Sequence, residues 1–485
     1  MMDVKHESKV VSAWMGRAAV CAALALAATG AQAQNSSSAS NPFYGSVTVA
    51  PVTDSVLRLS LDEAVARGLK TNLGLKEAES GELELKGLKN EALQQFLPSI
   101  SLSGGTGVHQ HNLEAQGFGP GTLAKFGDLL GMDTSGFSPI TKNDLTQGQL
   151  NFSQTLFSGP VIAGWKAASA AQKVAYFAKM SARGEVVQQV STAYLRALAA
   201  SSEVDNAQAL LDADQVSLDH VKAAHEAGTA ANLDELRARV QLQAQQQALI
   251  AARTEREKNL ILLKREIGID PGQKIELTDQ APYGELAQQT PEEVRAIAYK
   301  SRQDYQNLQN QVVELKAVHQ AYRAQRLPTL SFRGYWGVDT VNGAGTHGNF
   351  AAMGTLSFPI FREASLRGNE QASTAQLDGV RSQLADLHDR IDQQVRAALL
   401  DVDAAHKLVD VARSNVDLAT QALADETERV QAGVDDNLPL VTAQATLANA
   451  QTNLVESLYR YNVSKLVLAR AAGILETQYK VYLGN

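Results

Sequence analysis

An internal repeat constrains the fold of this chain more than any other feature of its sequence. The tripeptide Gln-Gln-Val at 188–190 returns at 393–395, Gly228 returns as Gly433, and Gly268 returns as Gly473. All three pairs are 205 residues apart, so nothing is inserted between them. The chain therefore builds one structural unit twice.

A second offset shows where the two copies differ in length. Leu-Pro-Ser at 97–99 returns as Leu-Pro-Thr at 327–329, and the expected helix caps Ser60 and Thr290 are also 230 residues apart. The fall from 230 to 205 means that the first copy carries extra residues between Pro98 and Gln188. We expect these residues to form a long loop over 110–144.

The first residues indicate a secretory signal peptide over 1–33. A cationic start, an apolar stretch at 18–28 and the small-residue cleavage site Ala-Gln-Ala at 31–33 are its three parts. The single cysteine, Cys21, lies in the apolar stretch, so we expect the mature protein to have neither a disulfide nor a thiol nucleophile. Only a different start codon would make a lipid anchor on Cys21 an alternative.

Four segments alternate in polarity, as strands do when one face meets an apolar medium and the other meets water. Their apolar members are Ile100, Leu102, Leu150, Phe152, Leu330, Phe332, Leu356 and Phe358. We therefore expect two β-strands at about 98–157 and two at about 328–361. The edge of an ordinary sandwich is the alternative for these segments alone. In a membrane, four strands cannot close a barrel and open edges are not tolerated, so oligomerisation would be obligatory.

Long helical stretches follow each strand pair. From Pro160 to Gly228 is 68 residues, a rod of about 100 Å at 1.5 Å per residue, and residues 365–433 repeat it. Shorter helices of about 54 Å flank each rod, and they are expected at 61–96, 233–268, 291–326 and 438–473. Two short helices match one rod in length. We therefore expect helical hairpins over 160–268 and 365–473 that form a wall.

Small apolar residues recur along both rods at alternating spacings of three and four, which is typical of a coiled-coil seam. In the first rod they are Val190, Ala193, Ala197, Ala200, Val204, Ala207 and Leu211, and in the second Val395, Ala398, Val402, Ala405, Val409, Ala412, Val416, Ala419 and Leu423. The Ala and Val content favours closely spaced helices in a tubular array. A plain antiparallel coiled-coil hairpin is the alternative.

The repeat and the helices divide the chain as follows. We expect a signal peptide over 1–33, an N-terminal segment over 34–59, a first repeat over 60–272, a linker over 273–289, a second repeat over 290–475 and a C-terminal tail over 476–485.

Charge and motifs argue against nucleic-acid binding and against catalysis. The formal net charge is −8, and no stretch concentrates Lys and Arg. The sequence has no Gly-rich phosphate loop, no Gly-x-Ser-x-Gly elbow and no paired His and carboxylate motif with metal spacing. His109 and His111 could share one side of a strand, but no third ligand is evident. We expect no enzymatic activity, no cofactor and no metal.

The order of these features resembles the TolC-type outer-membrane efflux family, the outer membrane factors, over nearly all of the mature chain. The matching segments are Leu-Asp-Glu-Ala-Val at 61–65, Leu-Pro at 97–98, Gln-Thr-Leu-Phe-Ser-Gly at 154–159, Leu-Pro-Thr-Leu at 327–330, Phe-Pro-Ile-Phe at 358–361 and Arg-Val-Gln-Ala-Gly at 429–433. No single segment is specific, but their duplicated order behind a signal peptide is highly specific.

The resemblance implies an α+β membrane protein that works as a homotrimer. Each protomer would give four strands to a transmembrane β-barrel, which an α-helical barrel of coiled-coil hairpins extends through the periplasm. The protein would lie in the cell outer membrane, in contact with its lipid, as the passive exit duct of a tripartite efflux or type I secretion system. The resemblance also implies that the N-terminal segment over 34–59 is periplasmic and that the linker over 273–289 lies in an equatorial belt.

The implied partners are a periplasmic adaptor (membrane fusion) protein and an inner-membrane pump of the RND, ABC or MFS type. The sequence leaves the transported substrate and the pump class open. The alternative function is a periplasmic coiled-coil scaffold or adaptor without a membrane barrel, which would leave the four alternating segments without a role.

The resemblance also places the two hairpin turns at the inner tip of the duct. We expect Gly228 and Gly433 to adopt positive φ where the helices end. With Asp234 and Arg429 they would contact the adaptor.

Two acidic residues in the second turn are the candidate gate. Threefold symmetry would multiply Asp435 and Asp436 into carboxylate rings, which select for cations in a narrow pore. Their alternative role is as helix-start charges that the helix macrodipole favours.

Four aromatic residues near the expected strand ends are candidates for the membrane interface, where aromatic girdles form. They are Trp165, Tyr335, Trp336 and Phe361. Packing among helices is the alternative.

Overall fold

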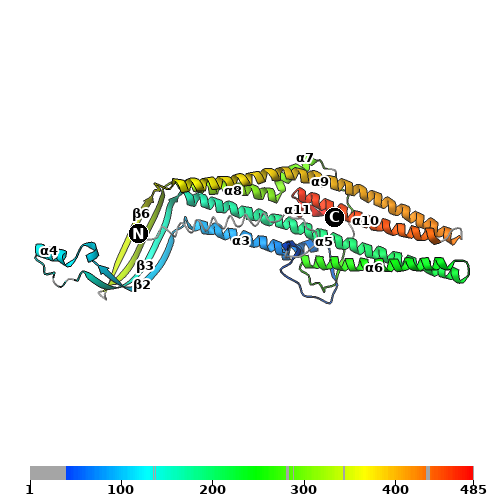
Figure 1. The fold of residues 1–485 in the computed structure, drawn as a ribbon, viewed down its shortest axis with the longest axis horizontal. Helices are drawn as coiled ribbons and strands as arrows, with labels where there is room; N and C mark the ends of the chain where they lie inside the picture. The colour runs from blue at the N-terminus through cyan, green and yellow to red at the C-terminus, as the bar shows by residue number, and fades with distance from the viewer. Residues whose placement is uncertain are drawn as a thin grey trace.

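The computed structural model describes residues 40–134, 136, 138–279, 283–287, 289–341, 345–432 and 437–483. The expected signal peptide over 1–33 lies outside this range. The molecule is long and narrow, with a β-sheet towards one end and the ends of two helical hairpins at the other (Figure 1). None of the helices in the described part of the chain combines the length and the apolarity that crossing a membrane requires.

The sheet has four antiparallel strands in the order β2-β3-β5-β6. They are β2 (Ser99–Asn112), β3 (Ile140–Ser158), β5 (Thr329–Val341) and β6 (Thr346–Ser357). Each half of the chain gives two of them, as the alternating segments predict. β2 and β6 form the two edges, and neither has a second strand partner within the described chain.

The extra residues of the first copy form more regular secondary structure than the sequence predicts. The sequence predicts a loop over 110–144, but β2 continues to Asn112 and β3 begins at Ile140, because the two strands stay paired to that point. Between them lie a short 3₁₀ helix, η2 (Glu114–Gln116), and α4 (Pro120–Leu130). The β2–β3 ribbon thus extends beyond the end of β5 and carries α4 at the end of the molecule opposite the hairpins (Figure 1).

Two rods form the length of the helical part. They are α5 (Gly159–Glu226) and α9 (Glu363–Gln431), and each turns back into a shorter helix, α6 (Asn232–Glu266) or α10 (Asn437–Ala471). Along α5 lie α3 (Leu73–Gln94) and α6, and along α9 lie α8 (Gln303–Ala324) and α10. Because α5 also contacts α8 and α10, the helices join into one wall (Figure 1).

The seam predicted along both rods is the packed side of the wall. Val190, Ala197 and Val409 are completely buried. Between α5 and α6, Val204 and Ala207 pack with Leu249. The small side chains allow the close helix spacing that the sequence indicates.

The helices expected at 61–96 and 291–326 are each broken once, which corrects the prediction of single helices. The first becomes α2 (Leu61–Thr71) and α3, and the second becomes α7 (Pro291–Ser301) and α8. The break residues are Asn72 and Arg302, both with extended backbone at ψ 132° and 124°. They are 230 residues apart, so the break belongs to the repeated unit.

Local chemistry explains the first break. The buried Asn72 side chain accepts a hydrogen bond from the Leu75 nitrogen and donates one to the Phe43 carbonyl at 2.7 Å. It therefore caps α3 and anchors the preceding segment at the same time. Next to this break, Gly268 has φ +70° and lies against Thr71. A Cβ atom on Gly268 would be 2.4 Å from the Thr48 carbonyl oxygen.

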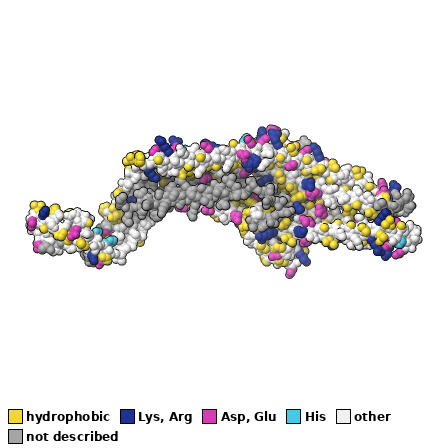
Figure 2. Space-filling view, in the orientation of Figure 1, with side chains coloured by type: hydrophobic (Ala, Val, Ile, Leu, Met, Phe, Trp, Pro, Cys, Tyr) yellow, Lys and Arg dark blue, Asp and Glu magenta, His cyan; other side chains and the backbone are white. Residues whose placement is uncertain are grey.

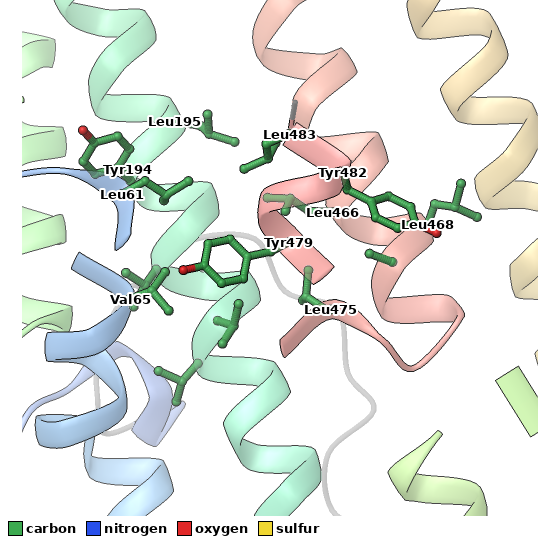
Figure 3. Packing of buried hydrophobic residues seen from close by; sticks show 14 of the residues in the cluster. Leu61, Val65, Tyr194, Leu195, Leu466, Leu468, Leu475, Tyr479, Tyr482 and Leu483 are labelled. Atoms are coloured by element: carbon green, nitrogen blue, oxygen red, sulfur yellow. The ribbon is translucent and has the colours of Figure 1, made fainter. Parts of the chain in front are cut away.

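A belt at mid-height holds the main core. There β1 (Leu57–Leu59) pairs in parallel with β4 (Ile275–Leu277). The sequence predicts a tail over 476–485, but α11 (Leu475–Leu483) packs into this core, where Tyr479 and Leu483 are buried (Figure 3). The Tyr479 hydroxyl donates to the Asp62 carboxylate at 2.7 Å. The C-terminal segment is therefore structural.

Candidate functional site

One row of large apolar side chains crosses all four strands of the sheet. Leu102 on β2 faces Leu150 on β3, Leu150 faces Trp336 on β5, and Trp336 faces Phe350 on β6. These side chains are 82%, 46%, 63% and 78% exposed. Because opposite residues in a sheet point to the same side, the row forms a continuous apolar stripe.

The same face is apolar above and below this row. Its other large members are Ile100, Phe152, Leu330, Phe332, Val338 and Leu356. Phe152 and Phe332 meet edge to face with ring centres 5.6 Å apart. From Leu330 to Val338 the band measures about 26 Å along the strand at 3.3 Å per residue. Before any strand tilt is considered, this is close to the apolar band of a transmembrane barrel, about 25 Å tall.

A row of four threonines closes the band on the side of α4. Thr106, Thr146, Thr340 and Thr346 are aligned across the sheet. Their hydroxyls pair across the strands at 2.9 Å and 2.8 Å. A polar row therefore crosses all four strands at one level, and beyond it Val108 on β2 faces Asp144 on β3.

The opposite face of the sheet is polar. Across from each other lie Ser103, Gln149, Gly337 and Asn349, and next to them Ser101, Asn151, Tyr335 and Ala351. The Asn151 amide donates to the Ser103 hydroxyl at 2.9 Å. Every residue of β2 is exposed, so both of its faces are open in the single chain.

The four aromatic candidates do not share one ring. Trp336 lies in the apolar row, in the middle of β5. Tyr335 is its neighbour and so lies on the polar face. Trp165 packs edge-on against Phe96 at 6.5 Å, within the chain. Phe361 is 96% exposed just beyond β6.

Phe350 was missed, although it belongs to the same row as Trp336. Its polarity pattern is weak, because Ala351 and Ala352 follow it. Only the strand register identifies it.

The other end of the molecule presents the hairpin turn between α5 and α6. Gly228 has φ +75°, as the sequence predicts, and no atom lies within 4 Å of where its Cβ would be. The following Thr229 donates from its nitrogen and its hydroxyl to the Ala224 carbonyl, both at 2.9 Å. Gly228 therefore ends α5 with a left-handed cap and is open to solvent.

The charged tip candidates have partners within their own hairpins. Asp234 lies 3.4 Å from Arg237, one turn along α6. Arg429 on α9 lies 3.9 Å from Glu426. Gly433, Asp435 and Asp436 lie outside the described residues, so their roles stay predictions.

The first hairpin has a polar interior that sequence reasoning missed. Asp214 is 3% exposed and accepts a hydrogen bond from Gln241 at 3.3 Å, and Glu235 is 8% exposed and pairs with Arg239 at 2.7 Å. The residues 205 positions later are Ala419 and Leu440, which are equally buried but apolar. Comparing the two halves position by position would have found this difference.

Burial changes the acidity of Asp214. Loss of contact with water raises the pKa of its carboxyl above the ordinary value of 3.8, and the Gln241 hydrogen bond only partly opposes this. The charged form is therefore unfavourable inside the first hairpin, whereas the second hairpin carries no such penalty at Ala419.

A groove lies between the two hairpins near the tip. Its volume is about 350 Å³, and it is lined by Leu233, Leu236, Arg237, Val240, Gln241 and Val441. The exposed fractions of Leu233 and Val240 are 55% and 66%. Apolar side chains open to solvent at this end are a candidate contact surface for another protein.

The sequence offers the two histidines of β2 as possible metal ligands. His109 and His111 share the polar face of β2, opposite Asn143 and Thr141. Across the described ranges, no group of three or more His, Cys, Asp or Glu side chains could hold a metal.

Comparisons with known proteins agree on one family. A family model described as "Outer membrane efflux protein" matches residues 69–268 and 294–474. The sequence is 23% identical over 365 residues to "Outer membrane protein TolC" of Escherichia coli (strain K12), which covers 71% of this chain and 72% of that protein.

Solved structures share the fold. A membrane protein from Pseudomonas aeruginosa superimposes with a TM-score of 0.73 at 20% identity, covering 87% of this chain and 97% of that one. The Campylobacter jejuni CmeC outer membrane channel gives a TM-score of 0.71 at 16% identity, covering 92% and 94%.

Proposed function

From the premise that this chain belongs to the outer membrane efflux protein family, we propose that it is the outer-membrane exit duct of a tripartite efflux or type I secretion system. The family is one of channels rather than enzymes, and the protein lies in the cell outer membrane with a helical periplasmic part. The duct would conduct substrates passively from a periplasmic adaptor and an inner-membrane pump of the RND, ABC or MFS type to the exterior.

The observation that carries the proposal is the single-layer sheet with one apolar face, one polar face and two free edges. In lipid, unpaired strand edges leave backbone groups without hydrogen bonds, so only a closed barrel is stable. Four strands are too few to close, whereas three copies give twelve. The apolar row through Trp336 then faces lipid, and the polar face lines the channel.

The helical wall supports the same homotrimer. One copy presents one long rod in each half, so three copies give six rods in a closed α-barrel that continues the channel. The rods measure about 100 Å at 1.5 Å per residue, which carries the tip far from the membrane. In this assembly Trp336 and Phe350 would face the lipid from the apolar face of the sheet, and the interface role of Trp165, Tyr335 and Phe361 stays a prediction.

The hairpin tips are the proposed contact with the adaptor. Gly228 lies in the first turn, Asp234 on α6 and Arg429 on α9 lie close to the hairpin ends, and Gly433 is expected in the second turn. The groove between α6 and α10 adds an apolar surface near them. Asp435 and Asp436 remain the proposed carboxylate rings of the gate. The transported substrate is not specified by any of these residues.

A periplasmic scaffold without a barrel is the competing function. It would leave the apolar face of the sheet exposed to water, which is unfavourable for four aligned large side chains. Membrane fractionation followed by native mass spectrometry in detergent separates the two. The duct predicts three copies extracted from the outer membrane, whereas a soluble periplasmic protein would contradict it.

A further inference from the structure

The polar face of the sheet, which lines the proposed channel, carries few charged side chains. On the side of the molecule seen in Figure 2, Lys, Arg, Asp and Glu are dense on the helices and sparse along the sheet. Among the strand residues that the structure describes, Asp339 on β5 is the only carboxylate on the polar face. The only arginine on that face, Arg333, is six residues away on the same strand, which is about 20 Å. The charge of Asp339 is therefore not balanced by an arginine or lysine of this face.

Asp339 is hydrogen-bonded to an amide on the neighbouring strand. The side-chain nitrogen of Asn349 on β6 donates to Oδ2 of Asp339. The other oxygens of the two side chains, Asp339 Oδ1 and Asn349 Oδ1, are closed off from solvent and have no hydrogen-bond partner in the described part of the chain. Reversing the amide would not relieve this, because it would put an oxygen against the carboxylate. Acceptors that are buried without a donor are unfavourable, so these two oxygens call for a missing partner.

A glycine lets a second amide side chain approach the same place. Gly337 lies two residues before Asp339 on the same face of β5, between Gln149 on β3 and Asn349 on β6. A Cβ atom on Gly337 would be 3.1 Å from Asn349 Oδ1 and 2.7 Å from Cγ of Gln149. The two amide side chains therefore converge over Gly337 from the flanking strands. One carboxylate and two amides, each from a different strand, border one spot in the channel wall.

We propose that Asp339, Asn349 and Gln149 bind a hard divalent cation of the Ca²⁺ class on the channel wall. The inference rests on the proposed duct and adds a cation site to it, on the side of α4. Ca²⁺ is bound by carboxylate oxygens, amide oxygens and water. Such a cation would contact the two oxygens that lack a donor and would balance the charge of Asp339. A water molecule could donate to both oxygens, but it would leave that charge unbalanced.

The histidine that faces this site is directed away from it. His347 is opposite Asp339 on β6, but its Nε2 lies 3.7 Å from where a Cβ atom of Gly345 would be. The imidazole is therefore directed along its own strand, away from Asn349. The remaining oxygen ligands suit Ca²⁺ better than Zn²⁺, which binds mostly sulfur and imidazole nitrogen. Measurements at about pH 8 keep imidazoles neutral, so that they do not compete with the cation.

Single-channel recordings in a planar bilayer test the site, with CaCl₂ added to one side of the membrane at a time. In the parent protein, Ca²⁺ should reduce the K⁺ conductance from the side that the α4 end faces, and EGTA should restore it. Asp339→Asn keeps the shape of the side chain and removes its charge. The half-blocking Ca²⁺ concentration should then rise about tenfold, because Ca²⁺ affinity depends on the charge of the ligands. Asn349→Asp adds a second carboxylate and should lower that concentration.

The matched control removes the same charge from the other face of the sheet. Asp144 on β3 is exposed there, opposite Val108, so Asp144→Asn should respond to Ca²⁺ as the parent does. A conducting parent that ignores Ca²⁺, or equal responses of Asp339→Asn and Asp144→Asn, would refute the site and leave the duct intact. Loss of the response in the Asp435→Asn, Asp436→Asn variant alone would move the bound cation to the tip. The absence of any conductance step would count against the duct itself.

Discussion

A Cβ atom on Gly473 would lie 2.6 Å from the backbone nitrogen of Arg302. Gly473 has φ +73° at the end of the second hairpin, and Arg302 is the break between α7 and α8. Gly268 also lies close to the first break, where a Cβ atom would be 2.9 Å from the hydroxyl of Thr71 and 2.4 Å from the Thr48 carbonyl oxygen. The duplicated glycine and the duplicated helix break are therefore one packing unit, which fixes the hairpins to the belt.

Replacing Gly473 by Ala should lower stability well beyond the effect of backbone strain. The left-handed conformation costs a non-glycine residue about 1–2 kcal/mol, and here the new methyl group also meets backbone atoms that cannot rotate away. Gly228→Ala is the control, because its φ is +75° and its surroundings are open. Thermal denaturation in detergent should show a clearly larger loss for Gly473→Ala, and equal losses would refute the packing argument.

Adjacent residues on β5 should respond oppositely to a charge. Trp336→Arg puts a guanidinium on the apolar face, where arginine near the bilayer midplane costs about 2–4 kcal/mol in a barrel. Tyr335→Arg puts it on the polar face, beside Asn151 and Ala351. The amount of heat-modifiable trimer in outer-membrane fractions should fall for the first variant and stay near the parent level for the second. If Tyr335→Arg reduced the amount of trimer and Trp336→Arg did not, the face that carries Tyr335 would be the one that faces lipid.

Removing the buried carboxylate of Asp214 should stabilise the first hairpin. The variant Asp214→Ala copies Ala419, its counterpart in the second hairpin. Hydrogen exchange should slow in the tip halves of α5 and α6. Asp212→Ala is the control, because that carboxylate is exposed and accepts a hydrogen bond from Gln208 on the same helix. Faster exchange in Asp214→Ala than in the control would show that the Gln241 hydrogen bond outweighs burial.

The pH dependence of this hairpin follows from the same residue. Because burial raises the pKa of Asp214 in the folded hairpin above the ordinary 3.8, the folded state holds the proton to higher pH than the unfolded state. Stability should therefore fall as the pH rises from about that ordinary value through the raised one. Hydrogen exchange in α5 and α6, measured at several pH values and corrected for intrinsic exchange rates, tests this. The loss of hairpin stability with rising pH should be smaller in Asp214→Ala than in the parent protein.

Neutralising the second turn should change the ion preference of the channel. Three copies of Asp435 and Asp436 around one axis would attract cations and repel one another. The double variant Asp435→Asn, Asp436→Asn should weaken cation selectivity and any block by multivalent cations. Reversal potentials in a salt gradient measure this. An unchanged preference would place both residues on the outer surface of the tip.

Much of the fold follows from local patterns in the sequence. The seam residues of α5 and α9 predict two long coiled-coil helices, and Ile100, Leu150 and Leu330 predict strands through their alternation with polar neighbours. These features depend on spacing along one segment. Because the chain contains an internal repeat, each helix or strand pattern occurs in both halves, and its second occurrence supports the first.

Features that depend on distant contacts could not be predicted in this way. The breaks at Asn72 and Arg302 lie where Gly268 and Gly473 approach from the ends of the hairpins, and the Asn72 side chain also binds the distant Phe43 carbonyl. Adjacency alone puts Trp336 and Tyr335 on different faces, but only register shows that Trp336 aligns with Leu150 and Phe350. α11 lacks a long helical pattern and is ordered by the core that it enters. The tip residues Asp435 and Asp436 remain predictions from family resemblance.

Recording currents through the purified protein in a planar lipid bilayer tests the duct most directly. If three copies close a barrel lined by the polar face of the sheet, insertion should give discrete conductance steps of uniform size, and oligomers that have been boiled to monomers should give none. A folded, outer-membrane trimer that inserts without any conductance step, under conditions that open its tip, would contradict the account.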